Sequence, residues 1–468
     1  MHAIACRPQR IRPQMRPTDA PVVTAAELRA AEAACLAAGT SQTALMDRAA
    51  CAVAREGVRF AQGRPILVLA GPGNNGGDAF GTARLLAKRG CDVVVAALGN
   101  KWRGAAADMR SAWTGRTLML ADAPVRPVVI DGLFGIGLSR PVEPAIAASM
   151  ERLRAAASFV LAIDIASGLD ADSGAVRGAV LRVDATLALG AVKRGHIQGA
   201  GIEASGALLL ETLGLDMGSS VRTLARPRLS PPGPADHKYT RGLVGVVGGA
   251  MPGASRLAAA AAARSGAGYV VLAGDDARVP FDAVVHREAI DADRAAAMLI
   301  GPGLGRGGRV RKICEEWVAS NRPLVLDGDA LALVDPDRLA RRAAPTILTP
   351  HDGEFARLFG ALGGDRIEAA IAAARRSGAV VVLKGAATIV AAPSGEARVH
   401  RPSSWLSTAG TGDVLAGLVA ARLAVAHAPF RAACEAVWLH ARAAALAGPA
   451  LVADDLAMHI PAAIAECL

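Results

Sequence analysis

The sequence predicts two α/β domains, and the first is predicted to be a three-layer α/β sandwich. Short, continuous apolar runs such as 66–70 and 243–247 are typical of buried parallel strands. Segments with helical periodicity alternate with these runs, which favours a parallel sheet covered by helices. A proline-rich stretch at 217–236 interrupts the alternation and indicates a linker between domains at 22–216 and 237–468.

The composition is that of a soluble protein that handles small anions. The net charge is +10, but the Arg residues are scattered, apart from a concentration at Arg7–Arg16 inside a segment, 1–21, that we expect to be disordered. A basic surface suits an anionic nucleotide, whereas 3% aromatic residues argue against a stacking platform for nucleic acid. The seven Cys lack paired spacing, which indicates a reducing compartment. No charge-free apolar run reaches about 18 residues, and the first residues lack a signal-peptide core. We therefore expect a cytoplasmic protein without membrane or nucleic-acid partners.

In the first domain, polar residues follow the predicted strands at the points where those strands end. Thr24 and Glu27 fit a capping box that begins a helix, and Ser41 begins a second helix. Strands are then predicted at 66–70, 93–97, 128–130 and 159–163. Because ligands in such folds bind beyond the carboxyl ends of the strands, we expect one binding rim there. The polar residues at these ends are Asn74, Asn75, Asp78, Asp131, Asp164 and Ser167.

The segment Gly71–Asp78 is the most unusual of these strand ends. It holds four glycines, two Asn and one Asp between a strand and a helix, and glycines let a backbone approach a ligand closely. It is not the dinucleotide fingerprint, because its polar residues lie inside the predicted loop. Asn75 and Asp131 offer hard oxygen ligands, which suit an alkali or alkaline-earth cation. The alternative is a pair of capping turns that bind nothing.

Residues 20–215 resemble the N-terminal epimerase domain of NAD(P)H-hydrate repair, the YjeF N-terminal family. The likeness rests on the motifs at 71–78, 131–138 and 164–169 and on Val192–Gly195. It implies a Rossmann-like three-layer α/β/α sandwich. It also implies an isomerase activity that interconverts the R and S hydrates of NADH or NADPH at C6. It further implies proton transfer by Asp164 and Lys193, and potassium binding by Asn75, Asp131 and Ser167. The implied substrate contacts are Asn74, Asn75, Gly76, Gly77, Asp78, Gly135, Ile136, Gly137, Leu138, Ser139, Arg140, Pro141 and Asp164.

This sequence departs from the family pattern at a few positions of the first domain. Ala166 stands where the family usually has Pro, and Ala79 stands where Gly is common. These changes affect the fit of the loops more than the reactive groups. Lys193 by itself would more often be a surface charge, and its place after an apolar strand predicted at 185–192 is what favours a site role.

The second domain repeats the alternation of strands and helices. Strands are predicted at 243–247, 269–273, 298–300, 324–326, 346–348 and 380–383, with a helix at 254–264. Its most informative stretch is Ser407–Gly417, where Gly410 and Gly412 precede Asp413 and an apolar helix. Free amides and the positive end of a helix dipole suit a phosphate, and a carboxylate beside it is a natural proton acceptor. The alternative is an ordinary glycine-rich loop.

Two further strand ends of this domain carry candidate groups. Lys384 and Gly385 combine a positive charge with an open backbone, which suits a nucleotide phosphate. His351 could hydrogen-bond a substrate, but Glu354 three residues later equally fits a structural helix start. The two interpretations of His351 stay open on the sequence alone.

Residues 237–468 resemble the ADP- or ATP-dependent NAD(P)H-hydrate dehydratases of the ribokinase-like superfamily. The motifs are His237–Gly242, G-P-G-L-G at 301–305, T-P-H-D-G-E at 349–354 and G-T-G-D-V-L at 410–415. The resemblance implies a ribokinase-like α/β domain with a lyase activity that uses ADP or ATP. Mg2+ is expected to bind alongside the nucleotide. Ala332 and Gly328 depart from the family pattern and leave one contact in doubt. The implied residues are Ala254, Gly303, His351 and catalytic Asp413 for the hydrate, and Lys384, Gly385, Ala386, Ala387, Thr388 and Gly412 for the nucleotide.

Together the two resemblances predict a bifunctional repair enzyme for hydrated NADH and NADPH, expected to be a homo-oligomer. One alternative is a sugar- or hydroxymethylpyrimidine-type kinase with an accessory N-terminal domain. Another is an RNA-associated scaffold, since N-terminal domains of this family also occur in such proteins. The sequence leaves open ADP against ATP, and the NADH hydrate against the NADPH hydrate.

Overall fold

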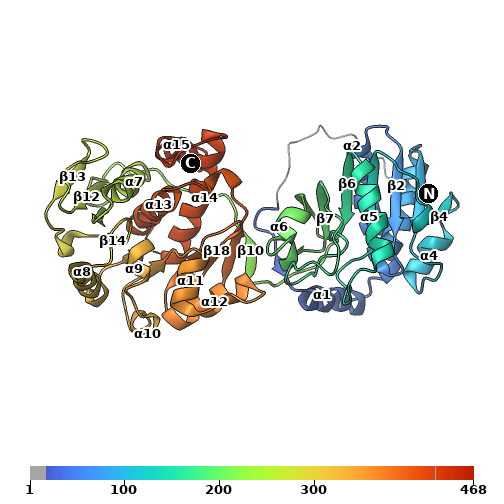
Figure 1. Cartoon of the computed structure of the whole chain (residues 1–468), viewed down its shortest axis with the longest axis horizontal. Helices are drawn as coiled ribbons and strands as arrows, with labels where there is room; N and C mark the ends of the chain where they lie inside the picture. Colours follow the sequence, from blue (N-terminus) through green and yellow to red (C-terminus); the bar gives the residue numbers. More distant parts are fainter. Residues whose placement is uncertain (1–16, 427) are drawn as a thin grey trace. The chain divides into compact units, whose positions relative to one another are not determined.

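The computed structural model describes residues 17–426 and 428–468, and the chain divides after Ser219 into two compact units (Figure 1). Most of the predicted disordered arm, residues 1–16, lies outside the described residues. The prediction is wrong for the end of that arm. Ala20 is buried, and the carbonyl of Pro21 accepts a hydrogen bond of 3.1 Å from Val192 N, so the chain is already packed there.

The first unit contains a seven-stranded, all-parallel sheet. In spatial order its strands are β4 (Thr117–Met119), β3 (Val93–Ala97), β2 (Ile66–Ala70), β5 (Val128–Gly132), β6 (Phe159–Ile163), β7 (Ala185–Leu189) and β9 (Ala207–Glu211). The chain runs outward from β2 to β4 and then returns to β5, so the switch point lies between β2 and β5. Ligands bind at such a point in doubly wound sheets.

Helices cover both faces of this sheet, which confirms the predicted three-layer fold. Ile66 and Val68 of β2 share one core cluster with α2 (Gln42–Ala61), α3 (Asn74–Lys88) and α4 (Ala105–Ser111). Leu67 and Leu69 share a second cluster with α5 (Pro144–Ala156) on the opposite face. All four side chains are fully buried, which is why the strand lacks the alternation of a half-exposed one.

The first two helices begin where the sequence predicts. Thr24 caps α1 (Ala25–Ala37) in a complete capping box with Glu27, and Ser41 caps α2. A short strand that the sequence did not reveal, β1 (Val22–Val23), precedes α1 and pairs in parallel with β8 (Val192–Lys193). The residues just before α1 are therefore joined to the segment that carries Lys193.

The second unit is built on a ten-stranded sheet that is parallel except around β18. In spatial order the strands are β10 (Val221–Thr223), β19 (Ala397–His400), β18 (Thr388–Ala391), β17 (Val380–Leu383), β16 (Thr346–Leu348), β15 (Leu324–Leu326), β14 (Ala297–Ile300), β11 (Leu243–Val247), β12 (Tyr269–Ala273) and β13 (Val284–Arg287). The helices α7 (Pro252–Arg264), α13 (Thr411–Ala426), α14 (Pro429–Ala447) and α15 (Ala453–Ala465) share one core cluster with this sheet. Figure 1 shows α8 (Gly308–Ala319), α11 (Asp352–Phe359) and α12 (Arg366–Ser377) on the other side.

The segment predicted as a linker, 217–236, is not structureless. It contains β10, which pairs in parallel with β19 at the edge of the second sheet. Val221 and Thr223 are buried and Arg222 between them is half-buried, so the strand shows the period of two expected at a sheet surface. The prolines that follow at 227, 231, 232 and 234 hid this short pattern.

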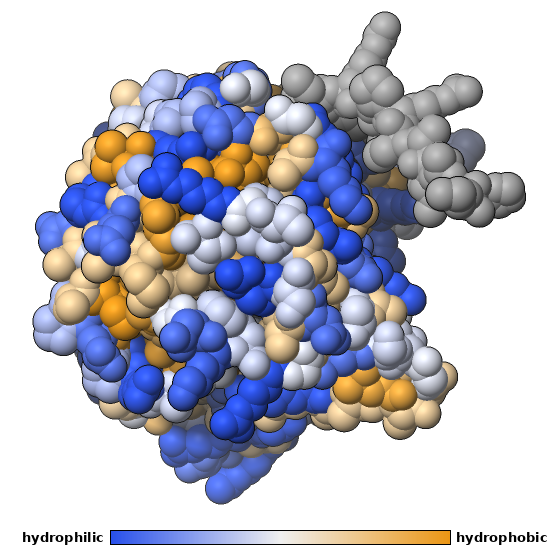
Figure 2. Space-filling model, turned by 90° about the vertical axis from the view of Figure 1, so that its right-hand side faces the viewer, coloured by the Kyte–Doolittle hydropathy of each residue, from blue (hydrophilic) through white to orange (hydrophobic). Residues whose placement is uncertain are grey.

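Among residues 17–426 and 428–468, no helix combines the length and the apolar character needed to cross a bilayer. On the face drawn in Figure 2, apolar side chains form separate groups among hydrophilic ones.

Candidate active sites

The segment Gly71–Asp78 is not the loop that the sequence predicted, because α3 already begins at Asn74. Three of its four glycines, at 71, 76 and 77, serve close packing, and none of the four has a positive φ. A Cβ on Gly71 would lie 1.7 Å from the carbonyl oxygen of Leu133, and one on Gly76 would lie 1.8 Å from that of Gly71. The N-cap residue Gly73 provides no side-chain hydrogen bond. The first amides of α3 therefore remain available to an anion at the switch point.

Asp131 and Ser167, two of the three residues predicted to bind a cation, lie in direct contact. Ser167 donates to Asp131 through its hydroxyl (2.7 Å) and its backbone N–H (2.9 Å), and both residues are fully buried. Burial raises the pKa of Asp131 to about 6, against the hydrogen bonds from Ser167 and Leu133 that lower it. Asn75 donates to the carbonyl of Phe134 (3.2 Å), which leaves its own side-chain oxygen as an acceptor.

Asp164 and Lys193 form a buried ion pair at the ends of β6 and β7. The Lys193 ammonium donates to the Asp164 carboxylate and to the carbonyls of Leu189 (2.6 Å) and Ala191 (3.1 Å), and the residue is fully buried. The strand predicted at 185–192 is broken after Leu189, because Gly190 takes a positive φ of 76°. This turn brings Lys193 back over the end of β7.

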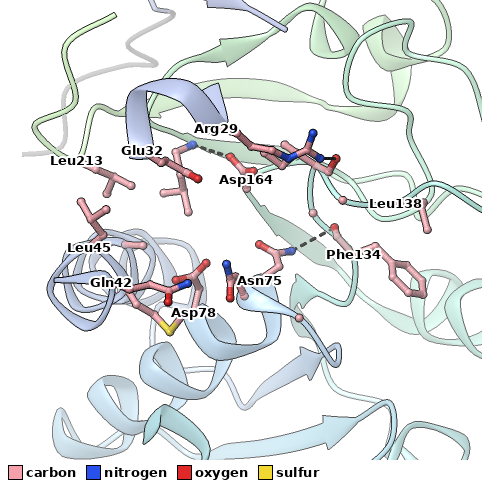
Figure 3. Close-up of a pocket in the computed structure, with 18 of the residues that line it drawn as sticks. Arg29, Glu32, Gln42, Leu45, Asn75, Asp78, Phe134, Leu138, Asp164 and Leu213 are labelled. Atoms are coloured by element: carbon pink, nitrogen blue, oxygen red, sulfur yellow. Dashed lines mark hydrogen bonds between the residues drawn. The ribbon is translucent and has the colours of Figure 1, made fainter. Parts of the chain in front are cut away.

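A cavity of about 540 Å3 opens at this rim (Figure 3). Figure 3 shows Asn75 and Asp78 from α3 and Asp164 after β6 directed into the same space. Lys193 does not line the cavity, and neither do Asp131 and Ser167. Of the predicted substrate contacts, Asn74, Asn75, Asp78, Gly135, Ile136, Gly137, Leu138, Ser139, Arg140 and Asp164 line it, whereas Gly76, Gly77 and Pro141 do not.

In the second unit, α13 begins at Thr411 and places Asp413 in its first turn, as predicted. Gly410 takes a positive φ of 86° just before the helix. The turn is held from two sides: Thr411 Oγ1 donates to the carbonyl of Leu406 (2.8 Å), and buried His440 of α14 donates from Nε2 to the carbonyl of Thr411 (2.9 Å). A carbonyl can only accept a hydrogen bond, so the Thr411 hydroxyl and His440 Nε2 are the donors. Together the two bonds hold the start of α13 in place.

Lys384 at the end of β17 is the cationic centre of this second site. It donates to Asp327 Oδ1 (2.7 Å), which also accepts from Thr349 Oγ1 (2.6 Å). The ammonium lies 3.9 Å from Glu354 Oε2, and a Cβ on Gly412 would lie 3.4 Å from it. Lys384 and Gly412, which were predicted together for the nucleotide, are therefore neighbours.

Burial and the neighbouring charges shift the pKa of Asp413. Burial raises the pKa of Asp413 to about 6, with Asp327 and Glu354 raising it further and Lys384 lowering it. Burial acts to lower the pKa of Lys384, but Asp327, Glu354 and Asp413 together raise it above its ordinary value. The site thus holds three carboxylates and a single ammonium among these four residues.

The remaining predicted residues of the second unit fall into two groups. His351 caps α11, because its Nδ1 accepts from the backbone N–H groups of Gly353 (3.0 Å) and Glu354 (3.4 Å), and its Nε2 lies 3.4 Å from Glu354 Oε1. Ala254 and Gly303 are neighbours, since a Cβ on Gly303 would lie 3.0 Å from that of Ala254. Ala387 and Thr388, by contrast, are buried at the start of β18, while Gly385 and Ala386 form the turn before it.

Comparison with known proteins assigns both units. The family described as "YjeF-related protein N-terminus" matches residues 42–195, and the family described as "NAD(P)H-hydrate dehydratase" matches residues 244–465. A "Bifunctional NAD(P)H-hydrate repair enzyme Nnr" of Mycobacterium tuberculosis is 36% identical over 422 residues, covering 85% of this chain and 88% of the relative. A protein of the same name from Gloeobacter violaceus is 38% identical over 475 residues, covering 90% and 92%. The chain belongs to the bifunctional NAD(P)H-hydrate repair enzymes.

A solved structure also resembles the second half of this repair enzyme. It is an ADP/ATP-dependent NAD(P)H-hydrate dehydratase from Bacillus subtilis, co-crystallised with ATP and Mg2+. It is 30% identical, covers 52% of this chain and 95% of its own, and has a TM-score of 0.48.

In both halves of the repair enzyme, residues that the sequence analysis did not assign lie in the sites. Glu32 and Arg29 of α1 line the first cavity. In the second unit Asp327 holds Lys384, and His440 holds Thr411. The motif D-G-D at 327–329 was a visible signal for Asp327, whereas Glu32 and His440 lie within Ala-rich helices without any motif.

Proposed function

We propose that the first unit epimerises the hydrates of NADH and NADPH at C6, and that the second dehydrates the S form at the expense of ADP or ATP. Both activities belong to the family of this chain. The observation that carries the assignment is that each unit has a site of its own. The Asp164 cavity and the Lys384–Asp413 cluster lie at the carboxyl ends of strands in two separate sheets. A kinase alone would leave the first site without a role.

In the proposed epimerase the α3 amides and the Arg29 and Arg140 side chains that line the cavity bind the phosphates of the substrate. Asp164 takes the proton of the C6 hydroxyl. Lys193 acts as a positioning residue, because its ammonium is fully engaged behind Asp164. This narrows its expected role, which was direct proton transfer.

Potassium fits the donor set of the first unit. Asp131, Ser167 and Asn75 supply only oxygen donors to a cation, which suits a hard alkali metal. The carboxylate of Asp131 is fully buried and has no basic partner within the described part of the chain, so a cation would supply the missing positive charge. A K+ ion held by these three residues would neutralise this charge.

In the proposed dehydratase Asp413 takes the proton of the C6 hydroxyl while the terminal phosphoryl group of the nucleotide is transferred to that oxygen. Phosphate then leaves, and the ring nitrogen lone pair drives the elimination. The Lys384 ammonium and the α13 amides near Gly412 stabilise the phosphoryl charge. Asp327 and Glu354 fit Mg2+, since they give carboxylate oxygens in excess of the local positive charge. The ion would neutralise phosphate charge.

A cytoplasmic location is part of this proposal and is supported by the free state of all six described cysteines. The expected homo-oligomer stays a prediction, which light scattering of the purified chain would test. The choice between ADP and ATP is tested by comparing both in the same assay.

The test of the proposed function is a recovery assay with a mixture of R and S hydrated NADH, followed at the absorbance of the reduced ring. With nucleotide, the full-length enzyme should recover both epimers, and without it none. Recovery of the S form alone would refute the epimerase assignment. A stable phosphorylated product would favour the kinase alternative.

A further inference from the structure

Glu32 lines the first cavity from α1, and hydrogen bonds anchor this helix to the rest of the unit. The start of α1 is fixed by its capping box and by a hydrogen bond of 2.6 Å from Ala25 N to the carboxylate of Asp172. Its middle is tied across the cavity mouth by Arg29, which donates to the carbonyl of Ile136 (3.0 Å). Glu32 lies one turn further on and lines the cavity.

Three carboxylates meet in this cavity, and they differ in their partners. Figure 3 shows Glu32 beside Asp164 and opposite Asp78, all directed inward. Asp164 accepts from Lys193 and from Leu189 N (3.0 Å). Among the described residues, neither Glu32 nor Asp78 has a hydrogen bond or an ion pair, although the Asp78 side chain is about nine-tenths buried. An unpartnered buried carboxylate directed into a cavity is costly unless it is protonated or meets a ligand.

We propose that Glu32 is a second catalytic residue of the epimerase, a general acid that works beside Asp164. This rests on the proposed function of the first unit. Of the three carboxylates in the cavity, Asp164 is paired with Lys193 and Glu32 has no partner among the described residues, and such a difference suits a division into base and acid. Sequence motifs assign no role to Glu32, and it lies outside the matched region 42–195.

The reaction that two such groups support is opening and closing of the hydrated ring. Asp164 takes the hydroxyl proton, the C6–O bond becomes a carbonyl, and the C6–N1 bond breaks with its electron pair going to N1. Glu32 gives its proton to N1. Rotation about the C5–C6 bond of the open aldehyde turns its other face to N1, and the reverse transfers close the ring as the opposite epimer. Atoms and charge balance without any further reactant.

The surrounding charges favour a protonated Glu32. Burial and the neighbouring Asp164 raise its pKa, while Lys193 and Arg29 oppose this shift. Asp78 faces it from α3, and burial, Asp164 and Glu32 raise the pKa of Asp78 in turn. Arg140 is the other cation of the lining. The acid form is lost as the pH rises through the raised pKa of Glu32, so the epimerisation rate should fall there.

The test uses the full-length enzyme and purified R hydrate without nucleotide, with the appearance of the S form followed by chromatography. Glu32→Gln should lower kcat by about 100-fold or more with KM changed less than about threefold, because the shape of the cavity is kept. It should also remove the fall in rate at higher pH. Glu32→Asp should restore part of kcat together with that pH dependence.

Glu151→Gln is the control, because it removes an exposed carboxylate of the same unit that neither lines the cavity nor caps α1. It should leave kcat within about twofold. Wild-type-like kcat in Glu32→Gln, or an unchanged pH profile, would overturn the proposal, as would a loss confined to KM. A wild-type enzyme that fails to form the S epimer would instead overturn the proposed function.

Discussion

The ammonium of Lys193 contacts the carboxylate of Asp164 from the side that faces away from the cavity. Asp164 has a positive φ of 69°, rare for a residue other than glycine, and His196 donates from Nε2 to its carbonyl (2.9 Å). His196 Nδ1 in turn accepts from Lys193 N (3.1 Å). Asp164 is therefore held by two neighbouring residues in a conformation that directs one oxygen toward the substrate.

Replacing Lys193 by Met should reduce epimerase kcat and stability together. The change breaks a buried ion pair and leaves two carbonyls without a donor, which costs about 3–5 kcal/mol. In urea unfolding of the full chain, the loss of stability should be confined to the transition of the first unit. Lys193→Arg keeps the charge and should lose less stability. Full epimerase activity in Lys193→Met would contradict the positioning role.

Replacing Asp413 by Asn should abolish dehydration and leave epimerisation intact. The loss of the base is expected to reduce dehydratase kcat by at least about 100-fold. The R-to-S interconversion without nucleotide serves as an internal control for folding. A normal rate of NADH recovery from S hydrate would show that Asp413 is not the base.

The dehydratase should lose activity at mildly acidic pH. Asp413 must be ionised to accept a proton, and burial raises its pKa to about 6. The value of kcat/KM for the S hydrate should therefore fall as the pH drops through about 6, whereas an ordinary Asp would allow activity to persist to more acidic pH. A flat profile down to the ordinary Asp range would contradict this environment.

Potassium should stabilise the first unit more than sodium does. Adding K+ is expected to raise the unfolding midpoint of the first unit, because a ligand that binds only the folded form stabilises that form. Asp131→Asn should remove the effect of K+, since it deletes the buried charge of the site. An equal shift by Na+ in both proteins would indicate a general salt effect.

The sequence predicted most strands correctly, because continuous apolar runs such as 66–70 and 243–247 are buried on both faces. It misplaced the start of α3, because glycines such as those at 76 and 77 normally disfavour a helix. These two positions are glycine because a Cβ would collide with the carbonyl oxygen of Gly71 or with Ala106. Glu32 could not be assigned, because only the folded chain brings α1 beside Asp164. The break after Leu189 depends on Gly190, whose side-chain position is filled by Leu28.

The pairing of β1 with β8 has a practical consequence for anyone who divides the protein. Residues 42–195 carry the recognised family pattern, and an expression plasmid designed on that boundary would discard β1 and α1. Such a fragment would keep Lys193 but lose β1, which pairs with its strand, and α1, which forms one wall of the cavity. A negative assay on that fragment would describe the truncation and not the enzyme.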